Sequence, residues 1–166
     1  MSEGEIINKV AQSPLITFNL EDFLPAKTAE LDLLSLVESG GILRETEFRT
    51  ALKSLDTAAL EGAVVRTYCS EDVILPAWAP ILLSSKLSDA GIQSIWAESV
   101  GAFWNQFYRE TLAKVDWESF RGKPIILKGC GDARVPKDAY VQAVQYLKPI
   151  AKKISYGEAC SAVPLK

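Results

Sequence analysis

The sequence predicts an α/β protein with a layered, parallel or mostly parallel sheet, built from two tandem helix-strand-helix-strand repeats. Two observations predict this class. Apolar residues alternate along the chain between helical stripes and short β-branched runs. The second half of the chain also resembles the first at an offset of 60 residues. Strands that alternate with helices pair in parallel through right-handed crossovers, which gives a layered sheet.

The repeat is visible without gaps. At this offset 13 of 71 aligned positions are identical, whereas average composition predicts roughly four or five. We therefore expect units at about 36–97 and 96–157 within a single domain, residues 1–166. The alternative is that two ordinary α/β units share turn chemistry by convergence. The matches are rich in turn and boundary residues, including Gly41/Gly101, Asp56/Asp116, Gly62/Gly122, Asp72/Asp132 and Pro76/Pro136.

The first half of each unit reads as a helix followed by a strand. Apolar residues at helical spacing predict helices over 44–55 and 101–115. Gly62 and Gly122 then mark turns into short β-branched runs, which predict strands over 63–68 and 124–128.

The second half of each unit repeats this order. Pro76 and Pro136 suit the first turn of a helix, so helices are expected over 76–87 and 136–147. The closing strands are expected over 92–97 and 152–157. Outside the units, 16–20 is a further candidate strand, 29–38 fits a short helix or a buried strand, and 1–14 is expected to be loosely ordered.

Composition bounds the class of protein. The chain has 166 residues, 48% of them apolar and 23% charged, with a net charge of −3. An acidic chain without a basic cluster lacks the electrostatic footprint of nucleic-acid binding. The longest apolar runs are too short to span a bilayer, and the acidic N-terminus does not resemble a signal peptide. We expect a cytoplasmic protein without nucleic-acid or membrane partners; the oligomeric state is left open.

The chain contains no histidine. This excludes the commonest general base, the Ser-His and Cys-His nucleophile pairs and every histidine-based metal site. Whether the protein is an enzyme stays open, and its chemistry would use Cys, Asp, Glu, Lys, Arg, Tyr, backbone groups or a bound cofactor.

The three cysteines follow expected strands. Cys69 comes directly after the strand at 63–68, Cys130 follows the strand at 124–128, and Cys160 follows the last strand. Carboxyl ends of parallel strands share one edge of a sheet, where ligands of open α/β sheets bind. The first two cysteines also precede proline-initiated helices, whose N-termini stabilise thiolates.

Three readings of these cysteines remain open. A metal site would use Cys69, Cys130 and Cys160, with Asp72 or Asp132 near the fourth position, and thiolates select zinc, copper(I) or an iron–sulfur cluster. A reactive thiol is the second reading. Inert, buried thiols are the third, because free cysteine often behaves as a small hydrophobe and no C-x-x-C pair is present. The alternative for Asp72 and Asp132 is a structural role, in which they cap the next helix or fix the loop.

Three segments carry a family resemblance: 69–79, 128–140 with its Lys-Gly-Cys and Val-Pro, and 156–165. From about Ile16 onward the chain resembles a bacterial family of uncharacterised proteins, a domain of unknown function. It departs from that pattern at Gly131, where serine is expected, and at Ala159, where proline is usual. The resemblance implies that all three thiols belong to the family pattern, and it supplies no catalytic residues.

Genes of this kind are expected near iron–sulfur assembly genes, so the resemblance implies iron–sulfur assembly proteins as partners. The leading hypothesis is an accessory protein that binds zinc or an iron–sulfur cluster through its three thiolates. A thiol-based redox protein or enzyme is the second hypothesis, and a non-catalytic interaction module is the third.

Overall fold

The computed structural model describes residues 15–37, 43–71, 74–128, 131–158 and 161–166. They form a mixed α/β protein with four α-helices in the described part of the chain. The chain divides into two compact units. One, here called the inserted unit, is Pro25–Phe107. The other, the outer unit, combines Met1–Leu24 with Tyr108–Lys166, so the inserted unit interrupts it in sequence.

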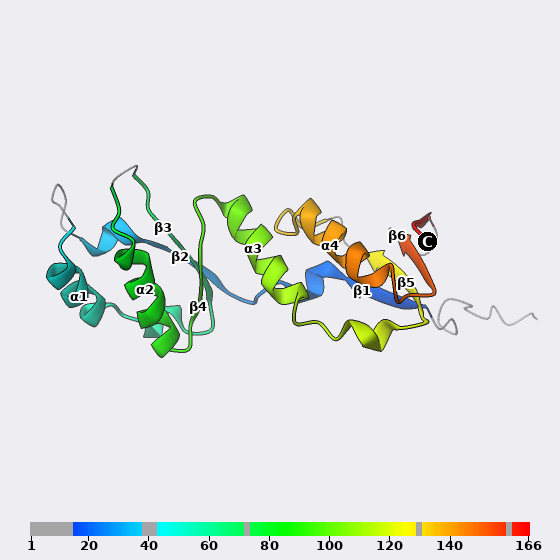
Figure 1. Cartoon of the computed structure of the whole chain (residues 1–166), viewed down its shortest axis with the longest axis horizontal. Helices are drawn as coiled ribbons and strands as arrows, with labels where there is room; N and C mark the ends of the chain where they lie inside the picture. Colours follow the sequence, from blue (N-terminus) through cyan, green and yellow to red (C-terminus); the bar gives the residue numbers. More distant parts are fainter. Residues whose placement is uncertain (1–14, 38–42, 72–73, 129–130, 159–160) are drawn as a thin grey trace, which may run out of the picture. The chain divides into compact units, whose positions relative to one another are not determined.

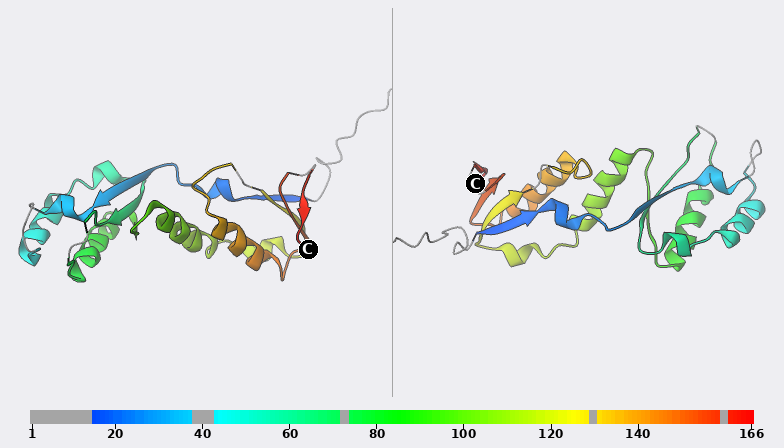
Figure 2. Two further views of the ribbon diagram at one scale, coloured as in Figure 1. Left: turned by 90° about the horizontal axis from the view of Figure 1, so that it is seen from above. Right: turned by 180° about the vertical axis from the view of Figure 1, so that it is seen from behind.

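The inserted unit contains a three-stranded parallel sheet in the order β2-β3-β4 (Figure 1). Because the three strands lie side by side in chain order and their crossovers are right-handed, both crossover helices lie on the same face of the sheet. Figure 2 shows α1 and α2 together on one side of these strands. The elements are β2 (Thr28–Asp32), the 3-10 helix η2 (Leu33–Leu36), α1 (Glu45–Ser54), η3 (Ala58–Leu60), β3 (Val64–Tyr68), α2 (Trp78–Asp89) and β4 (Gln93–Trp96).

The core of the inserted unit lies between this sheet and its helices. Val65 of β3, Phe48 of α1 and Leu83 of α2 are fully buried in one cluster. Leu33, which opens η2 directly after β2, is also fully buried there. The alternation of strand side chains sends Val65 to the helical face, while its neighbours Val64 and Arg66 point to the other face.

The outer unit has a four-stranded sheet in the order β1-β5-β6-β7, in which only β7 is antiparallel. Figure 1 shows α4 beside β1, β5 and β6. Helix α3 runs through the boundary between the units at Phe107 and Tyr108. The elements are β1 (Ile16–Asn19), η1 (Leu20–Phe23), α3 (Val100–Leu112), η4 (Trp117–Phe120), β5 (Pro124–Lys128), α4 (Lys137–Leu147), β6 (Lys153–Tyr156) and β7 (Val163–Pro164).

An aromatic cluster forms part of the core of the outer unit. Phe18 of β1 packs against Trp117 and Phe120 of η4, with ring centroids 5.2 and 5.4 Å apart. Leu127 and Ile154 on the neighbouring strands are fully buried. These side chains therefore point to the face of the sheet on which η4 and α4 lie.

Most elements expected from the sequence are present. The strand expected at 124–128 is β5, and the helices and the other strands agree to within a few residues. The segment 29–38, which fitted either a helix or a strand, contains both, because β2 ends at Asp32 and η2 follows. The strands form two sheets instead of one, and each sheet begins with a strand that lies outside the helix-first unit expected from the sequence.

The series β2-η2-α1-η3-β3-α2-β4 and β1-η1-α3-η4-β5-α4-β6 nevertheless follow the same order: strand, 3-10 helix, α-helix, 3-10 helix, strand, α-helix, strand. Helix α3 begins in the inserted unit, and the outer unit ends with the additional strand β7. Strands β5 and β6 begin and end 60 residues after β3 and β4. Gly62 and Gly122 have φ angles of +72° and +71° in matching turns. An ancestral duplication stays a prediction.

No α-helix in the described ranges is long and apolar enough to cross a membrane.

Candidate functional site

The cysteine loops follow strands of different sheets. Cys69 comes directly after β3 in the inserted unit, where its side chain is partly buried and its Sγ lies 3.3 Å from the carbonyl oxygen of Glu71, to which the thiol donates. Cys130 and Cys160 follow β5 and β6 of the outer unit in sequence. These two cysteines and Asp72 lie outside the described residues. The edge that the sequence predicted for all three thiols therefore divides between two sheets.

The described part of the chain holds no group of three Cys, Asp or Glu side chains arranged to bind a metal ion. Of the five residues predicted to form a metal site, that part includes Cys69 and Asp132. The metal site stays a prediction, and zinc and an iron–sulfur cluster stay its candidate occupants.

The loop after β3 is held by a carboxylate from the neighbouring strand. Asp32, at the end of β2, accepts hydrogen bonds through Oδ1 from the backbone N–H of Ser70 at 3.2 Å and of Leu34 at 3.0 Å. Partial burial raises the pKa of Asp32, but the hydrogen bonds from Ser70 and Leu34 and the charge of Arg66 outweigh burial and hold it below the ordinary value. Asp32 therefore fixes the residue next to Cys69.

The loop after β5 is held in a similar way. Glu21, in η1 directly after β1, accepts through Oε1 from the backbone N–H of Gly131 at 3.3 Å and of Asp132 at 3.2 Å. A Cβ at Gly131 would come 3.4 Å from the same carboxylate oxygen, which is an ordinary van der Waals contact, so this anchor does not require glycine. In both units a carboxylate next to the first strand thus anchors the loop that follows the middle strand.

Asp132 fixes its own loop. Its Oδ1 accepts from the backbone N–H of Arg134 at 2.9 Å, and the Arg134 guanidinium pairs with both carboxylate oxygens. The hydrogen bonds from Arg134 lower the pKa of Asp132 to about 2. The expectation that Asp132 fixes the loop through side-chain to backbone bonding is confirmed. A metal would have to displace Arg134 to use this carboxylate.

A second charged group, Arg66, lies in β3, the strand that leads into the Cys69 loop. Arg66 is 8% exposed and its Nε donates to Glu30 Oε1 at 3.0 Å, while its Nη1 donates to the carbonyl oxygen of Ala97 at 3.0 Å. The guanidinium carbon also lies 3.8 Å from the centre of the Tyr68 ring. These contacts compensate the cost of burying the charge, which gives Arg66 a structural role.

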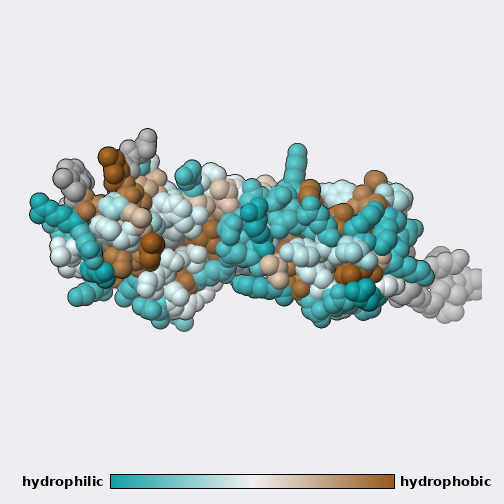
Figure 3. All heavy atoms as spheres, viewed as in Figure 1, coloured by the Kyte–Doolittle hydropathy of each residue, from teal (hydrophilic) through white to brown (hydrophobic). Residues whose placement is uncertain are grey.

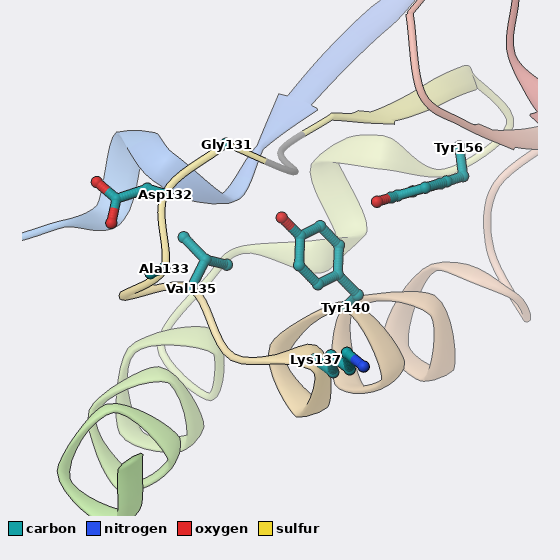
Figure 4. A pocket seen from close by; sticks show the side chains of 7 residues that line it. All are labelled: Gly131, Asp132, Ala133, Val135, Lys137, Tyr140 and Tyr156. Atoms are coloured by element: carbon teal, nitrogen blue, oxygen red, sulfur yellow. The ribbon is translucent and has the colours of Figure 1, made fainter. Parts of the chain in front are cut away.

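A pocket of about 640 Å³ opens beside the loop after β5 (Figure 4). Its volume is in the range of small-molecule sites. It lies near the carboxyl ends of β5 and β6 and the start of α4, where ligands of open α/β sheets bind. The lining residues that the structure describes all belong to the outer unit and are Gly131, Asp132, Ala133, Val135, Lys137, Tyr140 and Tyr156.

Two tyrosine rings form one side of this pocket. Tyr140 of α4 and Tyr156 of β6 meet edge to face, with centroids 5.7 Å apart and an interplanar angle of 87°. In Figure 4 the Tyr140 hydroxyl points towards the loop that carries Gly131 and Val135, and the Tyr156 hydroxyl points towards Tyr140. The Asp132 carboxylate points away from both rings. The pocket therefore combines aromatic and apolar walls with the two tyrosine hydroxyls and Lys137.

A buried tyrosine, Tyr108, holds η1 of the outer unit in place. Tyr108 of α3 is fully buried, and its hydroxyl donates to the carbonyl oxygen of Leu20 at 2.9 Å. Burial raises the pKa of Tyr108, and the nearby Tyr140 and Asp132 raise it further. Tyr108 therefore stays neutral and acts as a hydrogen-bond donor that fixes η1, the element that carries Glu21.

The candidate residues predicted from the sequence did not include Glu21, Asp32 or the two tyrosines of the pocket. One local signal was available for the anchors. Asn19-Leu20 and Asp32-Leu33 each pair a capping side chain with a fully buried leucine where the first strand ends. The pairing of Tyr140 with Tyr156 had no local signal, because it depends on how α4 lies on β6.

Comparison with known proteins gives one family. No curated protein and no solved structure matches the chain significantly. The family profile described as a protein of unknown function, DUF2480, matches residues 4–166. Because this match covers nearly the whole sequence, the chain belongs to the DUF2480 family of proteins of unknown function.

Proposed function

We propose that the protein binds a metal, either zinc or the iron of an iron–sulfur cluster, through the thiolates of Cys130 and Cys160. The observation that carries this proposal is the pairing of β5 with β6. The two strands are parallel neighbours, with Leu127 opposite Tyr156, and the Gly157 N–H extends the ladder by donating to the Leu127 carbonyl at 3.1 Å. Both strands thus end at the same edge of one sheet.

Chain connectivity limits the distance between that edge and either cysteine. Cys130 comes two residues after β5 ends at Lys128, and Cys160 comes four residues after β6 ends at Tyr156. An extended chain covers at most ~3.5 Å per residue, and neighbouring strands lie ~4.8 Å apart. A single metal, with metal–sulfur bonds of ~2.3 Å, is therefore within reach of both residues. Cys69 follows β3 of the other sheet, so the proposal leaves it out.

Two thiolates leave coordination positions open. Closed structural zinc sites use four protein ligands, whereas open positions accept water, a substrate or a partner's side chain. Asp132 is a poor additional ligand because Arg134 holds its carboxylate. An incomplete thiolate site suits an accessory protein that passes a metal or cluster to a partner. Iron–sulfur assembly proteins are the partners that the family resemblance motivates.

The test uses the full chain purified without oxygen and loaded with zinc, or with ferrous iron and sulfide. We expect bound metal in the wild type and in Cys69→Ser, which is the matched control. Cys130→Ser and Cys160→Ser should each lose it. A wild-type chain that stays metal-free after loading, or a Cys130→Ser/Cys160→Ser double variant that keeps its metal, contradicts the proposal.

The same strand pairing favours a second function, a dithiol that cycles with a disulfide. Disulfides need Cα atoms ~4.4–6.8 Å apart, which is close to the spacing of paired strands. Here a metal-free wild type would lose two titratable thiols on mild oxidation and regain them with a reductant. Cys69→Ser would keep this behaviour. The loss of no thiol on oxidation would rule out this second function.

The hypothesis of an interaction module has weaker support. Ile74 is fully exposed and Ile81 is 66% exposed, both in the inserted unit. Figure 3 shows apolar residues in several separate patches on the visible face, with hydrophilic residues between them. Scattered apolar side chains are normal on protein surfaces and do not by themselves mark a docking site.

A further inference from the structure

The geometry points to a second ligand site, independent of the thiols: the pocket at the start of α4 binds a small planar anion, an aromatic or conjugated carboxylate. The shape of the pocket carries the first part of this inference. Tyr140 and Tyr156 stand at 87° to each other, which forms a corner between two ring faces (Figure 4). A flat ligand can stack on one ring and meet the other edge to face, the two geometries that aromatic pairs prefer.

The remaining walls suit a ring as well. Val135 is 7% exposed and Ala133 and Gly131 present little side-chain bulk, so a planar group meets apolar surface there. The loop that supplies these walls is held in place by Glu21 and by the Asp132–Arg134 pair. A loop that is already fixed loses little conformational entropy when a ligand binds.

The charge of the pocket supports the other half of the inference, that the ligand is an anion. The carboxylates of the loop and of the first turn of α4 already have partners. Asp132 pairs with Arg134. Asp138 accepts a hydrogen bond from Gln142 at 2.7 Å and forms an ion pair with Arg109 at 3.8 Å. Lys137 is the one cation among the described lining residues, and no side chain in the described ranges forms an ion pair with it. An unmatched ammonium group favours a ligand with a negative charge.

The start of α4 adds to this preference. Pro136 is the N-cap residue and contributes no side-chain hydrogen bond to the helix. Helix α4 has 11 residues, so its N-terminal end carries a partial positive charge beside Lys137. A ligand with its carboxylate at Lys137 and its ring between Tyr140 and Tyr156 would contact both the positive charge and the aromatic corner.

The test is a titration of the isotopically labelled full chain, followed through backbone amide signals in nuclear magnetic resonance spectra. The probes are benzoate, benzyl alcohol and benzylamine, which share a ring and differ in charge. We expect benzoate to give saturable shifts at Ala133, Val135 and Tyr140. Benzyl alcohol should bind more weakly and benzylamine should not bind. Equal responses to benzoate and benzylamine would overturn the charge preference.

Variants locate the site. Lys137→Gln should weaken benzoate binding by roughly two- to fivefold, the size expected for an exposed charge pair, and leave benzyl alcohol unchanged. Lys152→Gln removes the same charge from an exposed position outside the pocket and should have no effect. Tyr140→Leu should abolish the response to both ligands. If benzoate binds Lys137→Gln and wild type equally, the proposed site is wrong.

The result does not depend on the thiol proposal. None of the residues that carry this inference is Cys130 or Cys160. Benzoate binding should therefore persist in the Cys130→Ser/Cys160→Ser double variant without metal. If wild type binds metal but not benzoate, the pocket inference fails alone, and if it binds benzoate but no metal, the thiol proposal fails alone.

Discussion

The Glu21 carboxylate accepts a hydrogen bond from the backbone N–H of Asp132 at 3.2 Å, across 111 residues of sequence. Asp32 does the same for Ser70 at 3.2 Å in the inserted unit. Each bond joins the end of the first strand to the loop after the middle strand. In both cases the anchored residue lies one or two positions after a cysteine.

Replacing Glu21 with alanine should loosen the loop after β5. The N–H groups of Gly131 and Asp132 lose their acceptor, so their amide hydrogen exchange should speed up by several-fold. The free energy of unfolding should fall by about 1 kcal/mol, since these bonds are largely exposed. Asp22→Ala is the matched control, because Asp22 bonds Asn19 in the same 3-10 helix. Unchanged exchange at Asp132 in Glu21→Ala would show that this anchor is not formed.

The turns at Gly62 and Gly122 should respond alike to a Cβ. Both residues have φ near +70° with open space around the added atom, so any cost comes from the backbone alone. Gly62→Ala and Gly122→Ala should each lower the free energy of unfolding by about 1–2 kcal/mol.

Chemical denaturation, with hydrogen exchange in each unit, measures these two changes. Gly101→Ala is the control, because Gly101 lies in α3 without a positive φ, where alanine favours the helix. A neutral Gly122→Ala would contradict the assigned turn.

Tyr108→Phe removes one buried hydroxyl. The carbonyl of Leu20 then loses its 2.9 Å hydrogen bond, and an unsatisfied buried acceptor costs about 1–2 kcal/mol of unfolding free energy. Thermal unfolding measures the loss. Tyr146→Phe serves as the control, because Tyr146 is 39% exposed. Equal stability of Tyr108→Phe and wild type would mean that water replaces the hydroxyl.

The Asp132–Arg134 pair should contribute stability at neutral pH that is lost in acid. The pKa of Asp132 is about 2 in the folded protein, against an ordinary value of 3.8. A lowered pKa contributes stability above the ordinary value, and that stability is lost as pH falls through about 2. Arg134→Gln should move the pKa of Asp132 upward, as measured by titrating its carboxyl carbon signal.

Arg121→Gln is the control for this titration. It breaks a similarly exposed ion pair with Glu118 and should leave Asp132 unchanged. A pKa that stays near 2 in Arg134→Gln would show that another group lowers it.

Local features of the fold were available from the sequence. The strand at 124–128 was predicted with the bounds of β5, and the glycines in the turns that precede β3 and β5 have the positive φ that these turns require. Loop fixing was one of the roles expected for Asp132, and the partner that it bonds, Arg134, lies only two residues away. Apolar periodicity, turn chemistry and short-range capping depend on neighbouring residues, which the sequence contains directly.

Tertiary structure decided what pairs with what. β1 joins β5, whose residues are 109 positions later, while β2 and β3 form a sheet of their own. An alternating series of helices and strands is compatible with one sheet or with two, since parallel pairing is set by long-range packing. The division of the cysteine loops between two sheets, the Glu21–Asp132 bond and the Tyr140–Tyr156 corner all follow from that choice. The sequence by itself determined the elements and their turns, and the long-range pairing of strands determined which of their ends share a site.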